Sequence, residues 1–512
     1  PSMPLPFTLR PLLRACALAF TVSALSTAAV AHPQTAAVQI SRVWQYAHAL
    51  GGVAGQKAEI VAYDDRTDTL WVAGVVGVDV LDRSTGQLVA HIDVTNLGAV
   101  NSVAIHDGLA ALAIENGIDR SLPGFVVFYE TRTRAQSGQP VVVGSLPDML
   151  TFTPNGKRVL VASEATPNAG SQVDPAGSVS IVEVKSRSVK TLPIDPAIVG
   201  YDTLRQFPAL GNGTTRPNMT PYGPEPEYIA VDKEGRYAYV GLQEANGIAV
   251  LNLKTDSFEK IYSLGLKDFS LTGNEIDPHD QENGSGVPGR IEFRAAAVKG
   301  LYQPDTIAAY SHKDRTYLVM ANEGDSREDS ADERRGSAGS GAAELVPEGN
   351  DLSRLTLSNV DSAAGALVTF GGHSFSIRDA AGTIVFDSGS QLDREAIARG
   401  IYDDGRSDNK GVEPEGVALL HIEGRVLAFI GLERTLKSAI AVYDITNPRD
   451  ARFIDMIVSD GVLNDVSPEG LKAFRAGNRY FVAAAHEVSD TTSLFEIDLS
   501  KGRGRDHHSD DH

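Results

Sequence analysis

The chain repeats one hydrophobic pattern seven times: a polar residue, a short apolar run, a turn, and a second apolar run. In the clearest copy, Tyr228–Val231 leads into the turn Lys233–Gly235, and Tyr237–Val240 leads out of it. Alternating runs of this length around a turn predict two β-strands joined as a hairpin. Gly247–Asn252 then predicts a third strand and Phe258–Tyr262 a weaker fourth. Four strands repeated seven times predict an all-β fold, a seven-bladed β-propeller with long inter-blade insertions.

Acidic and amide residues mark both ends of the predicted hairpins. Each first strand opens on one of these residues: Glu59, Asn101, Asp148, Glu227, Asp305, Glu415 and Glu469. The second strand closes on a glutamate in every repeat except the first: Glu115, Glu164, Glu244, Glu323, Glu433 and Glu487. First strands are innermost in a propeller, so we expect two acidic rings at the mouth of a central channel. In five repeats the two acids are centred on the turn, which predicts that they oppose each other at roughly 4.5–5.5 Å.

Carboxylates so close together need a compensating cation, basic side chains or open water. A ligand set of hard oxygens favours Ca²⁺, with a second divalent or transition metal as a further possibility. The predicted metal ligands are Glu227, Glu244, Asp305, Glu323, Glu415, Glu433, Glu469 and Glu487. In the alternative interpretation, the acids pair with Arg327, Lys410 and Arg434, or stay hydrated around a wide channel.

Composition and the first residues predict an extracellular location. Residues 1–31 combine Arg10 and Arg14 with an apolar stretch and the small-residue exit Ala29–Ala31, which is typical of a secretory signal peptide. The one cysteine, Cys16, falls inside that segment, so the mature chain would have no disulfide and no thiolate metal site. A net charge of -20 argues against nucleic acid as a partner. We expect a secreted or periplasmic monomer without a membrane span.

One propeller is expected over residues 32–500, with a polar tail at 501–512. The predicted insertions cover residues 187–224, 266–303 and 325–412. They flank opening or closing acids, so their loops would overhang the acidic mouth. The last insertion is expected to hold its own hairpin, Ser374–Phe386, and Ala37–Trp44 is expected to pair with the last blade and close the ring.

Several motifs resemble the choice-of-anchor I family of secreted or surface propeller proteins. They are Ala321–Arg327, Arg406–Gly416, Gln303–Asp305, and Ser374–Ile377 with Val385–Gly389. The family is related in sequence to the mesenchyme-specific cell-surface glycoprotein, and some members carry the label alkaline phosphatase. The resemblance covers roughly Glu59 to Leu499. It implies a propeller fold and assigns no common activity to these motifs.

Three functions fit an acidic, metal-binding mouth. The first is a metal-dependent phosphoesterase of alkaline-phosphatase-like type acting on a small phosphorylated molecule, in which metal ions bind phosphate and supply hydroxide. Arg327, Arg406 and Lys410 would then be the catalytic residues that neutralise the remaining phosphate oxygens. The second is a non-catalytic, calcium-stabilised extracellular propeller that binds a surface partner. The third is a calcium-dependent, lactonase-like hydrolase. No nucleophile elbow or phosphate-binding loop decides between them.

Overall fold

The computed structural model describes residues 37–167, 173–205, 224–280, 290–326, 332–337, 345–346 and 350–500. Its compact unit runs from Val38 to Asp498. The expected all-β propeller architecture is confirmed: the described residues form seven four-stranded sheets, here called blades, and one five-stranded sheet. The predicted signal peptide (1–31) and polar tail (501–512) lie outside the described residues.

The seven blades follow one another along the chain. Blades 1 to 3 comprise β2 (Val61–Asp64), β3 (Thr69–Gly74), β4 (Gly77–Asp82) and β5 (Leu88–Asp93); β6 (Val100–His106), β7 (Leu109–Ile114), β8 (Pro123–Glu130) and β9 (Val141–Ser145); and β10 (Pro147–Phe152), β11 (Arg158–Ser163), β12 (Ser178–Glu183) and β13 (Val189–Pro193). Blades 4 and 5 comprise β14 (Pro226–Val231), β15 (Tyr237–Leu242), β16 (Gly247–Asn252) and β17 (Ser257–Ser263); and β20 (Ile307–His312), β21 (Arg315–Asn322), β25 (Ser374–Asp379) and β26 (Ile384–Asp387). Blades 6 and 7 comprise β27 (Pro414–Ile422), β28 (Arg425–Leu432), β29 (Ala439–Asp444) and β30 (Arg452–Val458); and β31 (Pro468–Ala476), β32 (Arg479–His486), β33 (Thr491–Ser500) and β1 (Ala37–Ala47).

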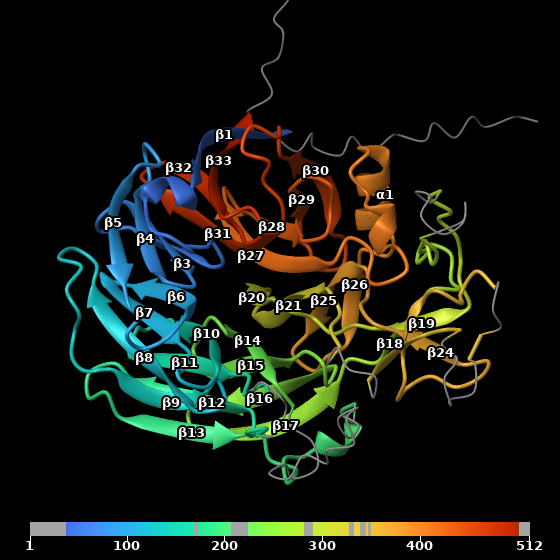
Figure 1. Cartoon of the computed structure of the whole chain (residues 1–512), viewed down its shortest axis with the longest axis horizontal. Coiled ribbons are helices and arrows are strands. Elements are labelled where there is room, and N and C mark those ends of the chain that lie inside the picture. Colours follow the sequence, from blue (N-terminus) through green and yellow to red (C-terminus); the bar gives the residue numbers. More distant parts are fainter. Residues whose placement is uncertain are drawn as a thin grey trace, which may run out of the picture. The chain divides into compact units, whose positions relative to one another are not determined.

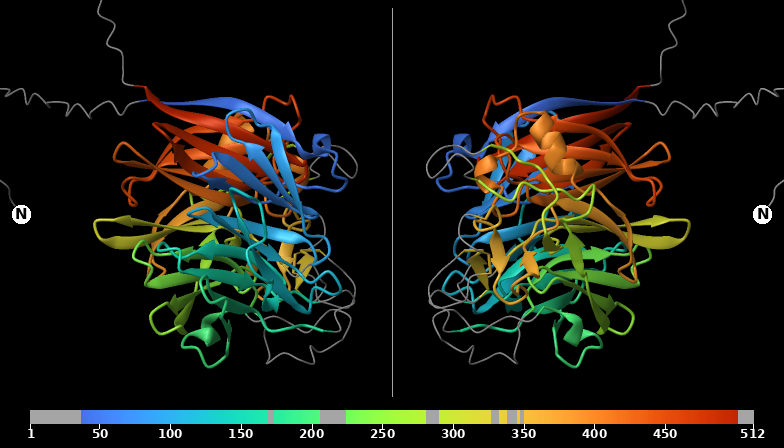
Figure 2. Two further views of the ribbon diagram at one scale, coloured as in Figure 1. Left: turned by 90° about the vertical axis from the view of Figure 1, so that its left-hand side faces the viewer. Right: turned by 90° about the vertical axis from the view of Figure 1, so that its right-hand side faces the viewer.

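The first strand of each blade lies at the centre of a ring. These inner strands contact one another in the order β2, β6, β10, β14, β20, β27, β31 and back to β2 (Figure 1). In blade 7 the outermost strand is β1, which lies beside β33. The predicted closure of the ring by the N-terminal strand is therefore confirmed. Figure 2 shows the blades from two sides.

Two of the insertions combine into one additional sheet. Its strands are β18 (Leu266–Asp268), β19 (Val298–Leu301), β22 (Glu333–Arg335), β23 (Thr356–Ser358) and β24 (Leu367–Thr369). β19 and β24, one from each insertion, pair in parallel. Phe269, Ile276 and Leu357 belong to a separate buried cluster at this sheet, which therefore has its own small core.

The predicted hairpin of the last insertion has a different place. Ser374–Asp379 pairs with β21, and Ile384–Asp387 pairs with Ser374–Asp379, so the two strands are the outer half of blade 5. The prediction that this hairpin belongs to the insertion was wrong, because the chain leaves blade 5 after its second strand and returns to complete it. The helical elements are α1 (Gln391–Ala398) and the 3-10 helices η1 (His48–Gly51), η2 (Tyr201–Thr203) and η3 (Asp404–Arg406). Within the described part of the chain, no helix has the length and apolarity needed to cross a membrane.

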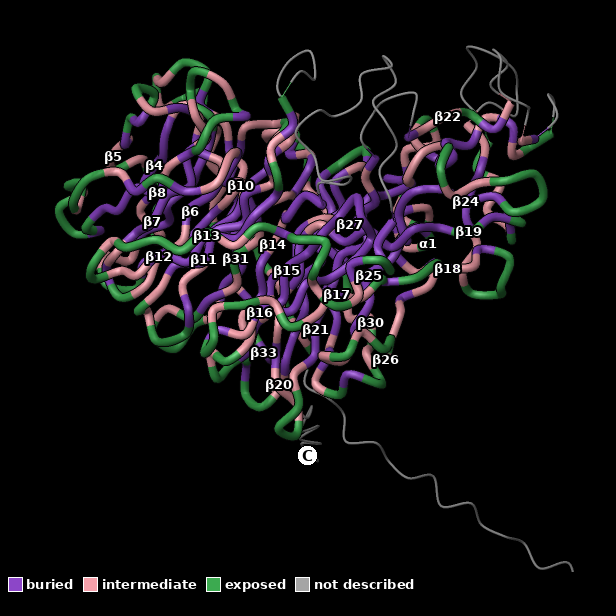
Figure 3. Tube along the Cα trace, turned by 90° about the horizontal axis from the view of Figure 1, so that it is seen from below, coloured by how far each residue is buried: buried purple, intermediate pink, exposed green. Residues whose placement is uncertain are grey.

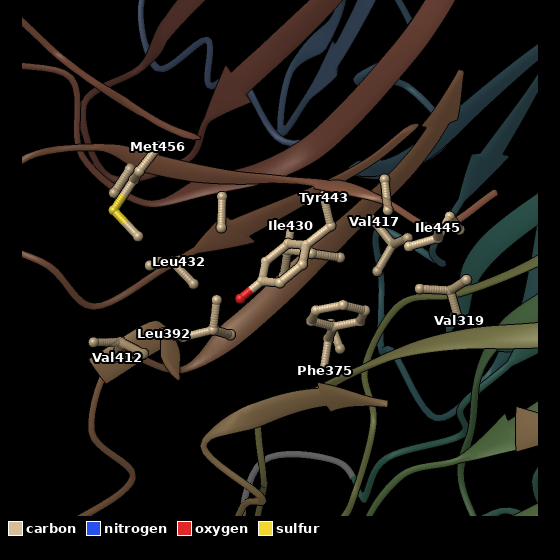
Figure 4. Packing of buried hydrophobic residues seen from close by; sticks show 14 of the residues in the cluster. Val319, Phe375, Leu392, Val412, Val417, Ile430, Leu432, Tyr443, Ile445 and Met456 are labelled. Atoms are coloured by element: carbon tan, nitrogen blue, oxygen red, sulfur yellow. The ribbon is translucent and has the colours of Figure 1, made fainter. Parts of the chain in front are cut away.

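Buried apolar residues form clusters that join neighbouring blades. Figure 3 shows the exposed residues concentrated in the turns at the edges. Between blades 5 and 6, the ring of Tyr443 meets the ring of Phe375 edge-on, with centroids 4.6 Å apart (Figure 4). Leu392 of α1 belongs to the same buried cluster. The Tyr443 hydroxyl donates a hydrogen bond to Gln391 at 3.1 Å, so α1 is tied to this blade interface by both apolar and polar contacts.

Candidate metal site in the central channel

One cavity of about 720 Å³ lies along the inner strands of all seven blades. Each blade contributes its opening residue to the wall: Glu59, Asn101, Asp148, Glu227, Asp305, Glu415 and Glu469. Of the closing glutamates, Glu487 lines the same cavity. The repeated polar position of the sequence therefore forms a ring of six carboxylates and one amide around a shared space.

Bulges in the inner strands place the opening residues at this wall. The pairing of inner and second strand shifts at the opening residue in five blades, for example between Pro226 and Ile229 and between Pro414 and Val417. A bulge leaves a residue without a partner in the ladder and turns its side chain away from the regular alternation. In four blades the residue two positions before the opening acid has a positive φ of 42° to 57°. These residues are Leu146, Gln303, Glu413 and Ser467. Such backbone strain is concentrated at functional positions in proteins.

The same bulges contradict the predicted opposition of opening and closing acids. The backbone N–H of Glu433 donates to the carbonyl of Glu413 at 2.9 Å, and that of Glu164 donates to Leu146 at 2.9 Å. The closing glutamate thus opposes the residue two positions before the opening acid. The prediction of directly opposed acids was wrong because simple counting along the hairpin ignores the unpaired bulge residues. The opening and closing acids form two layers instead.

Three groups of carboxylates are close enough to share an ion. They are Glu164, Glu225 and Glu244; Asp305, Glu323 and Glu415; and Glu323, Glu413 and Glu433, each with one oxygen per residue within 4.8 Å of the others. Calcium–oxygen distances of about 2.3–2.6 Å allow two ligands of one ion to lie up to about 5 Å apart. Each group joins two neighbouring blades. Five of the eight predicted ligands belong to these groups, whereas Glu227, Glu469 and Glu487 line the cavity outside them.

Basic side chains neutralise the group of Glu323, Glu413 and Glu433. The ammonium of Lys410 lies 3.2 Å from Glu413 and 3.4 Å from Glu323. Arg406 pairs with Glu413, and Arg434 pairs with Glu433. Arg406 and Lys410 are thus engaged with carboxylates rather than with an open phosphate site. Arg327, the third residue predicted to bind phosphate, lies outside the described residues.

The opening ring has no such compensation. Within the described ranges, none of its six carboxylates forms an ion pair, and one Glu415 oxygen is buried without a hydrogen-bond partner. Burial, followed by the charge of neighbouring carboxylates, raises the pKa of Glu59 to about 8. Burial also raises the pKa of Asp148 to about 6, against an opposing effect of Arg120. The pKa values of the other four carboxyls are raised well above their usual range, first by burial and then by the charge of neighbouring acids. These carboxyls are Glu227, Asp305, Glu415 and Glu469.

Comparison with known proteins identifies the family. The model of the choice-of-anchor I domain matches residues 59–448. The chain is thus a β-propeller, and it belongs to the choice-of-anchor I family. A search of curated proteins gave no match. Among solved structures, the chain is similar to the crystal structure of the Cps50 (Swd1) β-propeller domain of Myceliophteria thermophila, with 8% identity and a TM-score of 0.45 over 90% of this chain and 100% of that one.

Three members of the carboxylate groups were missed as ligand candidates: Glu164, Glu225 and Glu413. Glu164 was recognised only as a closing glutamate. Glu225 and Glu413 stand two residues before an opening acid, in the sequences Glu225-Pro-Glu227 and Glu413-Pro-Glu415. The shared acid-proline-acid spacing is a signal that could have found them. Proline supplies no N–H to the strand ladder and marks the bulge. The acid before it opposes the closing glutamate, and the acid after it is the opening acid at the bulge.

Proposed function

We propose that this protein is an extracellular propeller that binds a divalent cation, with calcium as the preferred ion, at the mouth of its central channel. The observation that carries this proposal is the ring of six opening carboxylates around one cavity, without an ion pair among the described residues. Buried carboxylates of the same sign are unstable unless they take up protons or a cation. A bound cation would satisfy the ring at physiological pH, where raised pKa values otherwise hold protons on it.

The best-supported position for the ion is the group of Asp305, Glu323 and Glu415. Asp305 and Glu415 line the cavity from neighbouring blades. Glu323, which is 8% exposed, is not among the lining residues, but its carboxylate lies within 4.8 Å of theirs. An ion held by all three would link blades 5 and 6. Calcium accepts six to eight oxygen ligands in flexible geometry, so water and carbonyl oxygens would complete the shell, whereas magnesium requires a stricter octahedron.

Binding of an extracellular surface partner is the function that this arrangement supports best. Ions that link blades would stiffen the ring, and the family resemblance favours a surface role. The predicted phosphate ligands Arg406 and Lys410 are held in ion pairs, which weakens the case for catalysis. Phosphoester hydrolysis is the second candidate, since an ion on Asp305 and Glu415 would keep coordination positions open toward the cavity. A phosphate and an attacking water would use such positions.

The test is elemental analysis of the purified protein, combined with melting curves and turnover of p-nitrophenyl phosphate and bis-p-nitrophenyl phosphate before and after chelation. Stoichiometric calcium, a lower melting temperature after chelation and no turnover would support the binding propeller. Chelator-sensitive turnover would instead establish the hydrolase. If calcium neither copurifies nor raises the melting temperature when added back, the cation proposal fails.

A further inference from the structure

A layer of small side chains lies three residues beyond the opening ring, and one blade departs from it. The residues at this position are Ala62, Ala104, Thr151, Ala230, Ala308, Ala418 and Lys472. All seven line the cavity. Their positions are equivalent, because each pairs with the second strand of its blade just beyond the opening, as Ala62 does with Trp71 and Lys472 with Ala483. Six of the seven residues are small, and the seventh brings an amine to this depth of the cavity.

Lys472 is the one lysine or arginine in the described wall of the cavity. It is an exposed position of β31, so its side chain projects into the channel rather than into the packing between blades. At roughly 3.3 Å per residue, shortened by the bulge, it lies about 7–10 Å below Glu469. Although the Lys472 side chain is exposed to the channel, the protein that surrounds the channel desolvates its amine and lowers its pKa. The surroundings therefore disfavour its charge in the absence of a partner.

Lys410 is a contrasting lysine, because its charge is paired within the protein. Its ammonium has three carboxylates within 3.2–3.7 Å. Lys472 has no ion pair or side-chain hydrogen bond within the part of the chain that the structure describes. A lysine that is left without a protein partner in a channel rich in carboxylates has its three donors available for a ligand.

We propose that Lys472 recognises an oxyanion, the phosphate or carboxylate group of a small ligand, inside the channel beneath the cation-binding mouth. This inference rests on the proposed function, because six carboxylates at the mouth repel an oxyanion unless a cation, or in its absence bound protons, neutralises them. A lysine binds phosphate and carboxylate as a point charge. The cavity of about 720 Å³ is within the usual range for small-molecule sites.

The test uses a matched pair of probes, phenylphosphonate and benzoate, with phenol as the neutral control. Binding to the calcium-saturated full chain is measured by calorimetry for wild type, Lys472→Ala, Lys472→Arg and Lys299→Ala. Lys299 is an exposed lysine of β19 outside the cavity. Lys299→Ala therefore removes the same charge as Lys472→Ala at a position away from the proposed site. Calcium stoichiometry and melting curves check that each variant is folded.

Loss of one charge-assisted contact should weaken oxyanion binding about 10- to 100-fold in Lys472→Ala. Lys472→Arg should retain most of the affinity, and Lys299→Ala should equal wild type. Preference for phenylphosphonate would identify a phosphate ligand, and preference for benzoate a carboxylate ligand. Equal affinities in wild type and Lys472→Ala, or no binding of either probe to wild type, would overturn the proposal.

The two proposals can fail separately. If the probes bind through Lys472 to a chain that takes up no calcium, the cation proposal fails and the role of Lys472 stands. If calcium binds at the mouth and the probes are indifferent to Lys472, the cation proposal stands and Lys472 is only a hydrated side chain of the channel.

Discussion

The opening acids and the closing glutamates form two acidic rings, the opening ring and the closing ring, which arise from one repeat and differ in their basic partners. In the closing ring, Glu323 faces Lys410 and Glu433 faces Arg434. In the opening ring, the six carboxylates form no ion pair among the described residues and share one cavity. The difference teaches that the chain supplies its own cations at Glu323 and Glu433 of the closing ring. Among the described residues, Glu164 and Glu244 of the same ring form no ion pair, and neither do the six opening carboxylates that face the channel.

The largest expected effect comes from removing the internal cation of the closing ring. Lys410→Met should lower the free energy of unfolding by about 3–5 kcal/mol in chelator, because Glu413 and Glu323 lose a mostly buried partner. Added calcium should restore part of this lost stability, since Glu323 and Glu413 would then be carboxylates without a lysine partner, like those of the opening ring. Urea unfolding with and without calcium measures both effects.

Lys254→Met is the matched control, because Lys254 is exposed in a turn outside both rings. It should change the unfolding free energy by less than about 0.5 kcal/mol. Equal stability of Lys410→Met and wild type would show that Lys410 does not stabilise the closing ring.

The opening ring is tested by the double variant Asp305→Asn, Glu415→Gln. Calcium affinity should fall about 100-fold, because two anionic ligands become neutral while their shapes are kept. The same change should raise the stability of the calcium-free protein, since it removes mutual repulsion. Calorimetry with calcium measures the first effect and thermal unfolding in chelator the second.

Glu234→Gln with Glu423→Gln is the charge-matched control, because both glutamates are exposed in turns away from the cavity. This control should keep wild-type calcium affinity. A double variant of the opening ring that binds calcium as tightly as wild type would remove Asp305 and Glu415 from the site.

Sequence periodicity predicted the propeller and the opening ring, because both depend on a pattern that recurs in every repeat. Pairing across the hairpins could not be predicted from counting, since bulges beside Pro147, Pro226, Pro414 and Pro468 shift the register. The shared sheet of the two insertions depends on long-range pairing of β19 with β24, for which the sequence carries no local pattern. Lys472 was visible in the sequence only after the repeats were aligned by their opening acids.

Metal-free protein should lose stability as pH rises. The pKa values of Glu59 and Glu433 are raised to about 8 in the folded state, whereas unfolded glutamate titrates near 4.3. The folded state therefore holds more protons than the unfolded state between these values, and stability falls as pH rises from about 5 to about 8.5. Water in the channel screens the charges, so we expect a loss on the order of 1–2 kcal/mol.

Calcium should flatten this pH profile, because it replaces the protons on the opening ring. Melting curves between pH 5 and pH 8.5, with calcium and with chelator, measure the difference. Metal-free protein whose stability rises over this range would contradict the raised pKa values.

The smallest expected effect is that of Arg434→Gln, which removes the second basic partner of the closing ring. Arg434 is 37% exposed and pairs with Glu433, and an ion pair with so exposed a partner contributes less than about 1 kcal/mol. Because the pKa of Glu433 is already about 8, its carboxyl is largely protonated at pH 6.5 and needs no arginine there. The variant should match wild type at pH 6.5 and be less stable at pH 9, as measured by urea unfolding. A loss above about 2 kcal/mol at pH 6.5 would mean that Glu433 is ionised there, and that the closing ring depends on Arg434 as well as Lys410.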